Sequence, residues 1–116
     1  MIAEGRKSQD EACVVCLYPE RAVFPVLMLK SAKIYSVGRD INRVDFVLDH
    51  PSVSRKHAQL RYDERYRVFV KDLNSTNGVF IDGNRLDVGE WALLQPEQKL
   101  VFGVSDVIYR IPRPAS

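Results

Sequence analysis

The stretch DHPSVSRKH, at positions 49–57, combines residue types that could do chemistry. Ser54 stands three residues before His57, a spacing that would suit a hydrolytic nucleophile and its base, with Asp49 as the orienting carboxylate. The same stretch could be an anion-binding loop, because hydroxyl groups and cations hold phosphate, or a plain turn before a strand. Taken alone, the stretch leaves all three interpretations open.

Two other short stretches carry polar groups that would suit an anion. Gly38 and Arg39 stand at the end of an expected strand, and the run DLNSTNG, at positions 72–78, crowds polar side chains before a glycine. Together with Ser54 and Arg55, these stretches supply an arginine, a hydroxyl group, a second cation and an amide, which is the inventory needed to hold a phosphate. Spacing alone does not show that the three stretches converge.

The elements that must position these residues are predicted to be strands. Short β-branched and aromatic runs recur every eight to twelve residues or so between turn signals, which is the all-β pattern. The expected strands are ACVVCL (12–17), FPVLML (24–29), KIYSVGR (33–39), FVLD (46–49), KHAQLRYD (56–63), YRVFVKDL (66–73), GVFID (78–82), WALL (91–94), KLVFG (99–103) and VIYRIP (107–112).

Turn signals separate these strands clearly. Asn77-Gly78 and Asp82-Gly83 are strong turn dipeptides, because both residue types tolerate positive φ. No long amphipathic helical pattern with caps interrupts the series. The sequence therefore predicts an all-β protein, a β-sandwich of ten or eleven short strands in which binding residues gather on the loops at one end.

The two cysteines, Cys13 and Cys16, raise the question of a redox or zinc site. Their C-x-x-C spacing falls in an expected strand, where residues three apart point to opposite faces. A structural zinc site also needs about four ligands, and the sequence offers no second Cys/His pair. We therefore expect two buried strand cysteines, with no metal and no cofactor.

Composition narrows the class of protein. The 116 residues suit one domain, and 46% hydrophobic with 28% charged residues is typical of a globular protein. A formal net charge of +2 gives no reason to expect nucleic acid as a partner. No apolar run approaches the length of a membrane span or forms a secretory signal. Cytoplasm or nucleus is therefore the default location.

The order Gly38-Arg39, then Ser54-x-x-His57, then Asn77-Gly78 resembles the forkhead-associated (FHA) domain, a module that reads phosphothreonine. The resemblance covers residues 11–112 and implies an eleven-stranded β-sandwich of the SMAD/FHA-like type. Residues 1–10 are then expected to be a polar N-terminal tail, and residues 113–116 the start of a linker or tail. It further implies the N-terminal recognition domain of a longer nuclear signalling or DNA-damage-response protein, with nucleus as the expected location and cytoplasm the second choice.

The resemblance also implies a role for each matching residue. Arg39, Ser54 and Arg55 would contact the phosphate. Asn77 would hold the peptide backbone, with Thr76 as a secondary contact. Ser52, a further candidate for peptide contact, stands where some relatives have a basic residue that helps to bind acidic ligands. A serine there argues against a strong preference for an acidic residue in the ligand. The residues expected to support the site without touching the ligand are Gly38, His57 and Gly78.

Two other functions stay open at this point. A hydrolase would use Ser54, His57 and Asp49, although Ser54 and His57 should face opposite ways on entering a strand. The chain could alternatively be a dimerisation or scaffold FHA domain with weak or lost phosphopeptide binding, since some relatives self-associate through a face of the sandwich. A phosphothreonine-containing protein or peptide is thus the expected partner, with a homodimer possible and neither nucleic acid nor membrane expected.

Overall fold

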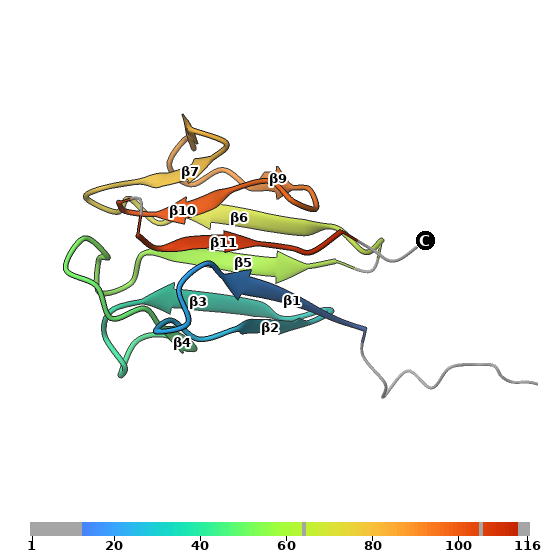
Figure 1. The fold of residues 1–116 in the computed structure, drawn as a ribbon, viewed down its shortest axis with the longest axis horizontal. Helices are drawn as coiled ribbons and strands as arrows, with labels where there is room; N and C mark the ends of the chain where they lie inside the picture. The colour runs from blue at the N-terminus through green and yellow to red at the C-terminus, as the bar shows by residue number, and fades with distance from the viewer. Residues whose placement is uncertain (1–12, 64, 105, 114–116) are drawn as a thin grey trace, which may run out of the picture.

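Two β-sheets form the protein, as the computed structural model shows for residues 13–63, 65–104 and 106–113 (Figure 1). One sheet has six strands in the order β2-β1-β11-β10-β7-β8, and the other has five in the order β4-β3-β5-β6-β9. The strands are β1 (Val14–Pro19), β2 (Leu27–Lys30), β3 (Ile34–Gly38), β4 (Phe46–Val47), β5 (Ala58–Tyr62), β6 (Val68–Asp72), β7 (Val79–Ile81), β8 (Asn84–Arg85), β9 (Ala92–Leu94), β10 (Leu100–Phe102) and β11 (Ile108–Arg110).

The core lies between the two sheets because apolar side chains alternate along the strands. In β5 the burial pattern places Leu60 inside, while Gln59 and Arg61 lie half-buried on the outer face. From the six-stranded sheet, Tyr109 is fully buried and donates a hydrogen bond from its hydroxyl group to the Pro25 carbonyl at 2.6 Å. Burying one large apolar side chain stabilises the fold by about 1.5–3 kcal/mol, so this interior is the main source of stability.

The structure confirms the all-β prediction and its eleven strands. Each of the ten expected strands overlaps an observed one. Eight observed strands lie within the expected ranges, whereas β1 and β2 start later than expected and run past the expected ends at Leu17 and Leu29. The eleventh, β8, had not been located in the sequence; it pairs with β7 across the Asp82-Gly83 turn, where φ is 49° and 84°. The tails expected at residues 1–10 and 113–116 lie outside the described residues except for Arg113, which pairs with Glu97 at 2.9 Å.

The expectation for the two cysteines needs correction. Both thiols are free and half-buried, where full burial was expected. Cys13 precedes β1 and packs against the core, while Cys16 lies within β1. Across the described ranges, no three His, Cys, Asp or Glu side chains gather as metal ligands.

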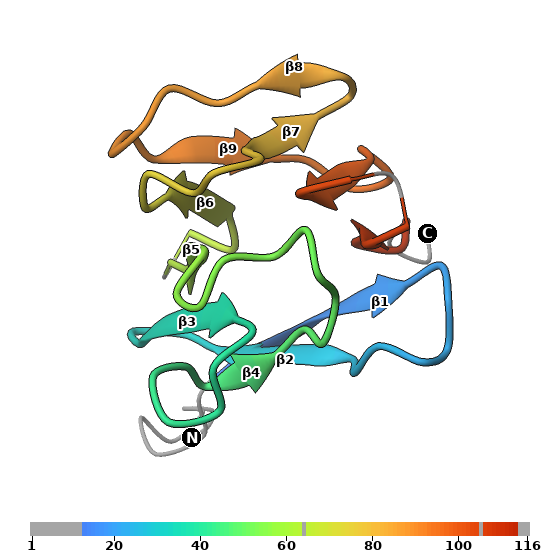
Figure 2. The same ribbon diagram turned by 90° about the vertical axis from the view of Figure 1, so that its left-hand side faces the viewer.

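One end of the sandwich collects the loops that carry the predicted site. The end of β3, the start of β5 and the end of β6 meet there, because β5 is antiparallel to both neighbours. Figure 2 looks onto this end, and the segment between β4 and β5 (green) crosses in front of the gap between the sheets. No helix long and apolar enough to cross a membrane occurs in the described part of the chain.

Candidate functional site

Backbone hydrogen bonds join the end of β3 to the segment before β5. The Arg39 N–H donates to the Ser54 carbonyl at 3.0 Å, and the Asp40 N–H donates to the Arg55 carbonyl at 3.1 Å. Gly38 makes this approach possible, because a Cβ atom there would overlap with the Arg55 carbonyl oxygen. The two loops therefore present Arg39, Ser54 and Arg55 side by side.

The Arg39 side chain is anchored through Nε. Its Nε–H donates to the Val53 carbonyl at 2.9 Å, which fixes the plane of the guanidinium. The two terminal nitrogens have no hydrogen bond to any described residue. Arg39, Asp40 and Arg55 line an open pocket of about 250 Å³. Both arginines are exposed there, so their charges face solvent over this pocket.

The Ser54 side chain is fixed by the neighbouring loop. Its Oγ accepts a hydrogen bond from the Thr76 backbone N–H at 3.2 Å, and its own backbone N–H donates to His57 Nδ1 at 2.9 Å. Since Oγ accepts from Thr76, the hydroxyl hydrogen is available to donate to an anion. The side chain is half-buried beside the exposed Arg55.

His57 connects two loops from within the protein. The ring is fully buried, and its Nε2 lies 2.8 Å from the Gly78 carbonyl. Because Nδ1 accepts from Ser54, we assign the ring proton to Nε2, which donates to Gly78. Burial lowers the pKa of His57 below its ordinary value of 6.5, outweighing the raising effects of the Gly78 carbonyl and the Asp72 charge. The ring is therefore neutral and tied at both nitrogens.

This arrangement contains no nucleophile and base pair. The His57 ring bonds the backbone of Ser54, and the Ser54 hydroxyl group contacts the Thr76 backbone instead. Nδ1 is occupied and Nε2 carries the proton, so neither ring nitrogen is placed to take a proton from the hydroxyl group. Ser54 and His57 were expected to face opposite ways on entering a strand. Both instead lie in the loop before β5, and the His57 ring turns back toward Ser54.

Asn77 and Ser52 are joined to each other across the loops. The Asn77 side-chain amide donates to the Ser52 carbonyl at 2.9 Å. The Ser52 hydroxyl oxygen accepts from the Val104 N–H at 3.1 Å and lies 2.9 Å from His50 Nδ1. The Ser52 side chain is thus engaged within the protein, whereas Thr76 and Asn77 remain exposed at the rim.

Gly78 connects the β6–β7 loop to neighbouring segments through its backbone hydrogen bonds. Its φ of 88° lies in the left-handed region, where a side chain is strained. Its N–H binds Ser75 Oγ at 3.0 Å, and its carbonyl accepts from both His57 and the Gly103 N–H, the latter at 2.9 Å. The loop conformation therefore depends on this one residue.

Sequence reasoning missed two supports of the same loop. Asp72 is fully buried, and its Oδ1 accepts from the Ser75 N–H at 2.9 Å. Ser75 is 5% exposed and caps the Gly78 N–H. The spacing Asp-x-x-Ser before Asn-Gly was the available signal, because such side chains bond backbone groups a few residues away.

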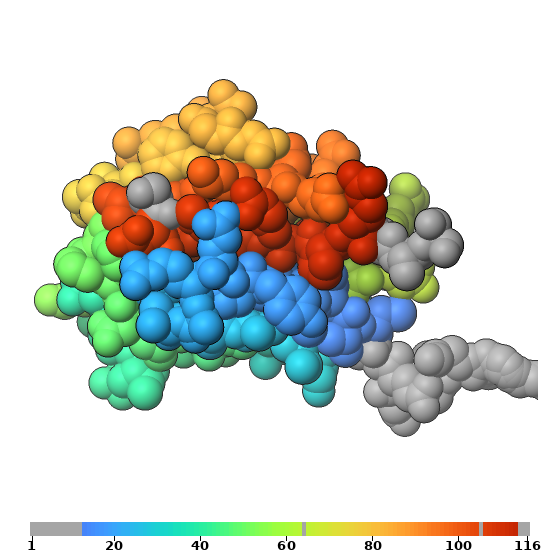
Figure 3. Space-filling view, viewed as in Figure 1, coloured from blue at the N-terminus to red at the C-terminus, as the bar shows by residue number. Residues whose placement is uncertain are grey.

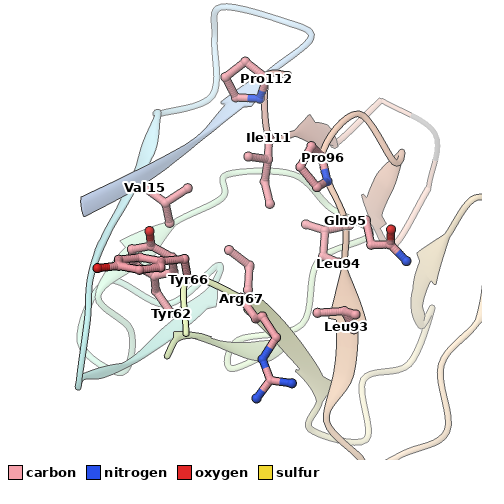
Figure 4. A pocket seen from close by; sticks show the side chains of 11 residues that line it. Val15, Tyr62, Tyr66, Arg67, Leu93, Leu94, Gln95, Pro96, Ile111 and Pro112 are labelled. Carbon is pink, nitrogen blue, oxygen red and sulfur yellow. The ribbon is translucent and has the colours of Figure 1, made fainter. Parts of the chain in front are cut away.

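A second cavity lies away from these loops. It has a volume of about 450 Å³, and Tyr62, Val68, Leu94 and Ile111 are among its lining residues (Figure 4). Tyr62 ends β5 and Val68 begins β6, so this apolar space opens at the opposite end of the sandwich from His57. None of the residues predicted for the site lines it.

Comparison with known proteins identifies the family. A family model of the FHA domain matches residues 35–103, which is more than half of the chain and includes all three loops. This chain belongs to the FHA domain family. FHA domains are recognition modules that read phosphorylated motifs with arginine, and they are not defined by a catalytic reaction.

Two relatives carry the domain within longer proteins. The human "Nuclear inhibitor of protein phosphatase 1" is 37% identical over 86 residues, covering 73% of this chain and 24% of that protein. The mouse "Smad nuclear-interacting protein 1" is 30% identical over 107 residues, covering 80% of this chain and 28% of that protein. The chain thus spans about a quarter of the length of these curated relatives.

Solved structures agree on the fold. The FHA domain of the CT664 protein from Chlamydia trachomatis superposes with a TM-score of 0.77 at 28% identity, covering 89% of this chain and all of that one. The N-terminal FHA domain of S. cerevisiae Rad53p, solved with a phosphothreonine peptide, superposes with a TM-score of 0.70 at 21% identity, covering 85% and 91%. The sandwich is therefore an FHA fold.

Proposed function

We propose that this chain binds a phosphothreonine-containing segment of another protein, with the phosphate held by Arg39, Ser54 and Arg55. The observation that supports this most is the pair of exposed arginines over one open pocket, with Arg39 anchored through Nε to Val53. An arginine whose plane is already fixed loses little freedom when it binds, and its terminal N–H groups match two phosphate oxygens.

Charge and hydrogen bonding are suited to a phosphate ester. Phosphothreonine carries about −1.5 to −2 charges near neutral pH, so Arg39 and Arg55 nearly balance it. Ser54 adds a hydroxyl donor at the same place. Asp40, which also lines the pocket, pairs with Arg43 at 3.0 Å, and this pairing reduces its repulsion of an anion.

The peptide around the phosphothreonine would contact the β6–β7 loop. In this proposal Asn77 exchanges its contact with the Ser52 carbonyl for one with the ligand backbone, and Thr76 lies beside it. Ser52 would take part in peptide binding through its carbonyl group, because its hydroxyl group already contacts Val104 and His50. Gly38, His57 and Gly78 support the loops from below.

We further propose a nuclear location and a role in nuclear signalling. Two of the relatives are named as nuclear proteins, a phosphatase inhibitor and a Smad-interacting protein. DNA-damage signalling is the narrower form of this proposal, and it rests on the family resemblance alone. Imaging of the tagged full-length protein, with and without DNA damage, tests both.

A peptide titration tests the binding proposal. Phosphothreonine peptides from a degenerate library are titrated by fluorescence anisotropy, with phosphoserine and unmodified versions beside them. Arg39→Ala should weaken binding by about 2–5 kcal/mol, because it removes one partner of a desolvated charge pair. Arg113→Ala is the matched control, since Arg113 is an exposed arginine paired with Glu97 outside the site. Equal affinity for phosphorylated and unmodified peptides would refute the proposal.

Self-association is a second candidate, supported by the outer face of the six-stranded sheet. Figure 3 shows this face, with β1 and β2 in blue beside β11 in red. Val14, Tyr18 and Met28 are between 46% and 50% exposed on these strands, an apolar patch that a second copy could cover. Sedimentation velocity at increasing concentration distinguishes a dimer from a monomer. Neither result affects the phosphopeptide proposal.

A further inference from the structure

Five side chains on the outer face of the five-stranded sheet alternate between cation and aromatic ring. The Arg61 guanidinium lies 4.7 Å from the Phe69 ring centre and 4.9 Å from that of Trp91. Arg67 covers Phe69 at 5.2 Å, and the Lys71 ammonium lies 4.5 Å from Trp91. We call this series the cation–aromatic ladder: Arg67, Phe69, Arg61, Trp91 and Lys71.

Strand register explains why these residues meet. Arg61 pairs with Phe69 across β5 and β6, and Phe69 pairs with Leu93 across β6 and β9. One step along, Val70 pairs with Ala92, which brings Lys71 beside Trp91. Since alternate residues point to opposite faces, the ladder lies outside the core.

Of the three cations in the ladder, one has an ion-pair partner among the described residues. Arg67 pairs with Asp63 at 2.9 Å. Arg61 and Lys71, by contrast, have no ion-pair partner among residues 13–63, 65–104 and 106–113. Arg61 Nε is also shielded from solvent and has no hydrogen-bond acceptor within the described part of the chain. A guanidinium stacked between rings keeps its N–H donors in its own plane, so Arg61 can still bind an anion at its edge.

Exposed aliphatic residues flank the ladder. Ile34 pairs with Arg61 across β3 and β5, so the row reads Ile34, Arg61, Phe69, Leu93 from β3 to β9. Ile34 is 51% exposed and Leu93 is 42% exposed. The face therefore offers positive charge with apolar contacts on both sides.

We propose that this face binds an acidic polypeptide segment that has aliphatic side chains among its carboxylates. Charge complementarity supports the choice, because Arg61 and Lys71 have no acidic partner in the described part of the chain, while Ile34 and Leu93 provide apolar contacts. Single-stranded nucleic acid fits less well, since bases stack on open ring faces and cations here cover Phe69 and Trp91. Figure 4 shows that Arg67, which lines part of the apolar cavity, directs its guanidinium away from Val15 and Ile111.

The test uses a labelled synthetic peptide of repeated Glu-Leu-Asp-Ser units and the variant Arg61→Gln/Lys71→Gln. The control, Lys30→Gln/Arg110→Gln, removes the same formal charge from the outer face of the other sheet, where Arg110 pairs with Glu20. We expect the first variant to lose at least tenfold in affinity and the control to lose little. Binding to wild type should weaken with added salt. Backbone amide shifts in the wild type should change along β5, β6 and β9, a readout that needs no variant.

Three outcomes would overturn the proposal. They are an equal loss in both double variants, no binding of the acidic peptide to wild type, or tighter binding of oligouridylate with the same dependence on Arg61 and Lys71. Phosphothreonine-peptide affinity should be unchanged in Arg61→Gln/Lys71→Gln, because neither residue lines the loop pocket. That comparison separates failure here from failure of the proposed phosphopeptide site.

Discussion

At the scale of single residues, Gly38 sets how closely β3 approaches the segment that carries Ser54 and Arg55. Its φ is not in the left-handed region, so glycine is needed at this position because it has no side chain. A Cβ atom would collide with the Arg55 backbone, which cannot move away as a flexible side chain can. The loops that carry Arg39 and Ser54 would then separate.

Gly38→Ala is therefore expected to cost about 1–3 kcal/mol of unfolding free energy, as overpacking does, and to weaken phosphopeptide binding. Urea denaturation and anisotropy titration measure the two effects. Gly89→Ala is the comparison, because that glycine has a φ of 80° but open space around its Cβ position. The alanine there should cost stability without affecting binding. Unchanged peptide affinity in Gly38→Ala would contradict this account.

His57 makes stability depend on pH, and the direction follows from its lowered pKa. Below about pH 6.5 the unfolded ring takes up a proton, while the buried ring in the folded protein resists protonation. Stability contributed by the neutral ring is thus present above pH 6.5 and lost as pH falls toward the folded pKa. Protonation of Nδ1 would also break its bond with the Ser54 N–H.

Chemical denaturation at several pH values between about 7.5 and 5 measures this loss. His57→Gln should be less stable at neutral pH but should show a smaller decrease between those values. His50→Gln controls for the other histidine, which is half-buried beside Ser52. Equal pH dependence in wild type and His57→Gln would show that His57 is not the titrating group. Stability is a better readout than phosphopeptide affinity, because the phosphate of the peptide itself titrates near pH 6.

At the scale of elements, hydrogen bonds between loops connect the segments that carry the site. Ser52 links the segment before β5 to the turn between β10 and β11 through its hydroxyl oxygen and the Val104 N–H. It lies 52 residues from Val104 in the sequence, so this bond joins the middle loop of the site to the opposite sheet.

Ser52→Ala should cost about 0.5–1.5 kcal/mol of stability, the net value of a typical hydrogen bond, and should speed amide exchange at Val104. Hydrogen exchange followed by NMR measures the local effect. Ser31→Ala is the control, because Ser31 is a half-buried serine on the β2–β3 turn. If Val104 exchange were unaltered, the Ser52 hydroxyl group would not be what holds this turn.

The elements also show what the sequence could and could not reveal. Alternation identified ten strands, because each has an apolar inner face. It missed β8, since Asn84 and Arg85 are both exposed and their pairing follows from the preceding turn. Sheet order was not predictable, because the parallel pairing of β3 with β4 and the neighbours β1 and β11 depend on contacts distant in sequence.

The same limit applies to the site. The motif residues on the three loops could be named from sequence, and the structure brings them to one end. The Asp-x-x-Ser spacing was a signal for Asp72 and Ser75, but their burial could not be predicted, because a buried carboxylate and an exposed one look alike in a polar run. The bond from Asn77 to the Ser52 carbonyl was equally hidden, since it depends on how two loops cross. Packing between distant segments decides these details.

At the scale of the whole molecule, the proposed phosphate site joins both sheets. Arg39 and Ser54 belong to loops of the five-stranded sheet, whereas Gly78 leads into β7 of the six-stranded sheet and binds Gly103 beside β10. His57 lies between these parts. A ligand that contacts Arg39, Ser54 and Asn77 together would therefore oppose global unfolding, and not merely order one loop.

Phosphopeptide binding should consequently stabilise the entire domain. At a free peptide concentration of about 100 times Kd, the expected gain is about 2.7 kcal/mol, which for a domain of this size raises Tm by roughly 10 °C. Differential scanning calorimetry with the phosphorylated and unmodified peptides measures the difference. Global hydrogen exchange should slow in strands of both sheets, because the slowest amides exchange through complete unfolding. Protection restricted to the loops, with no change in Tm, would mean that the site is mechanically separate from the sandwich.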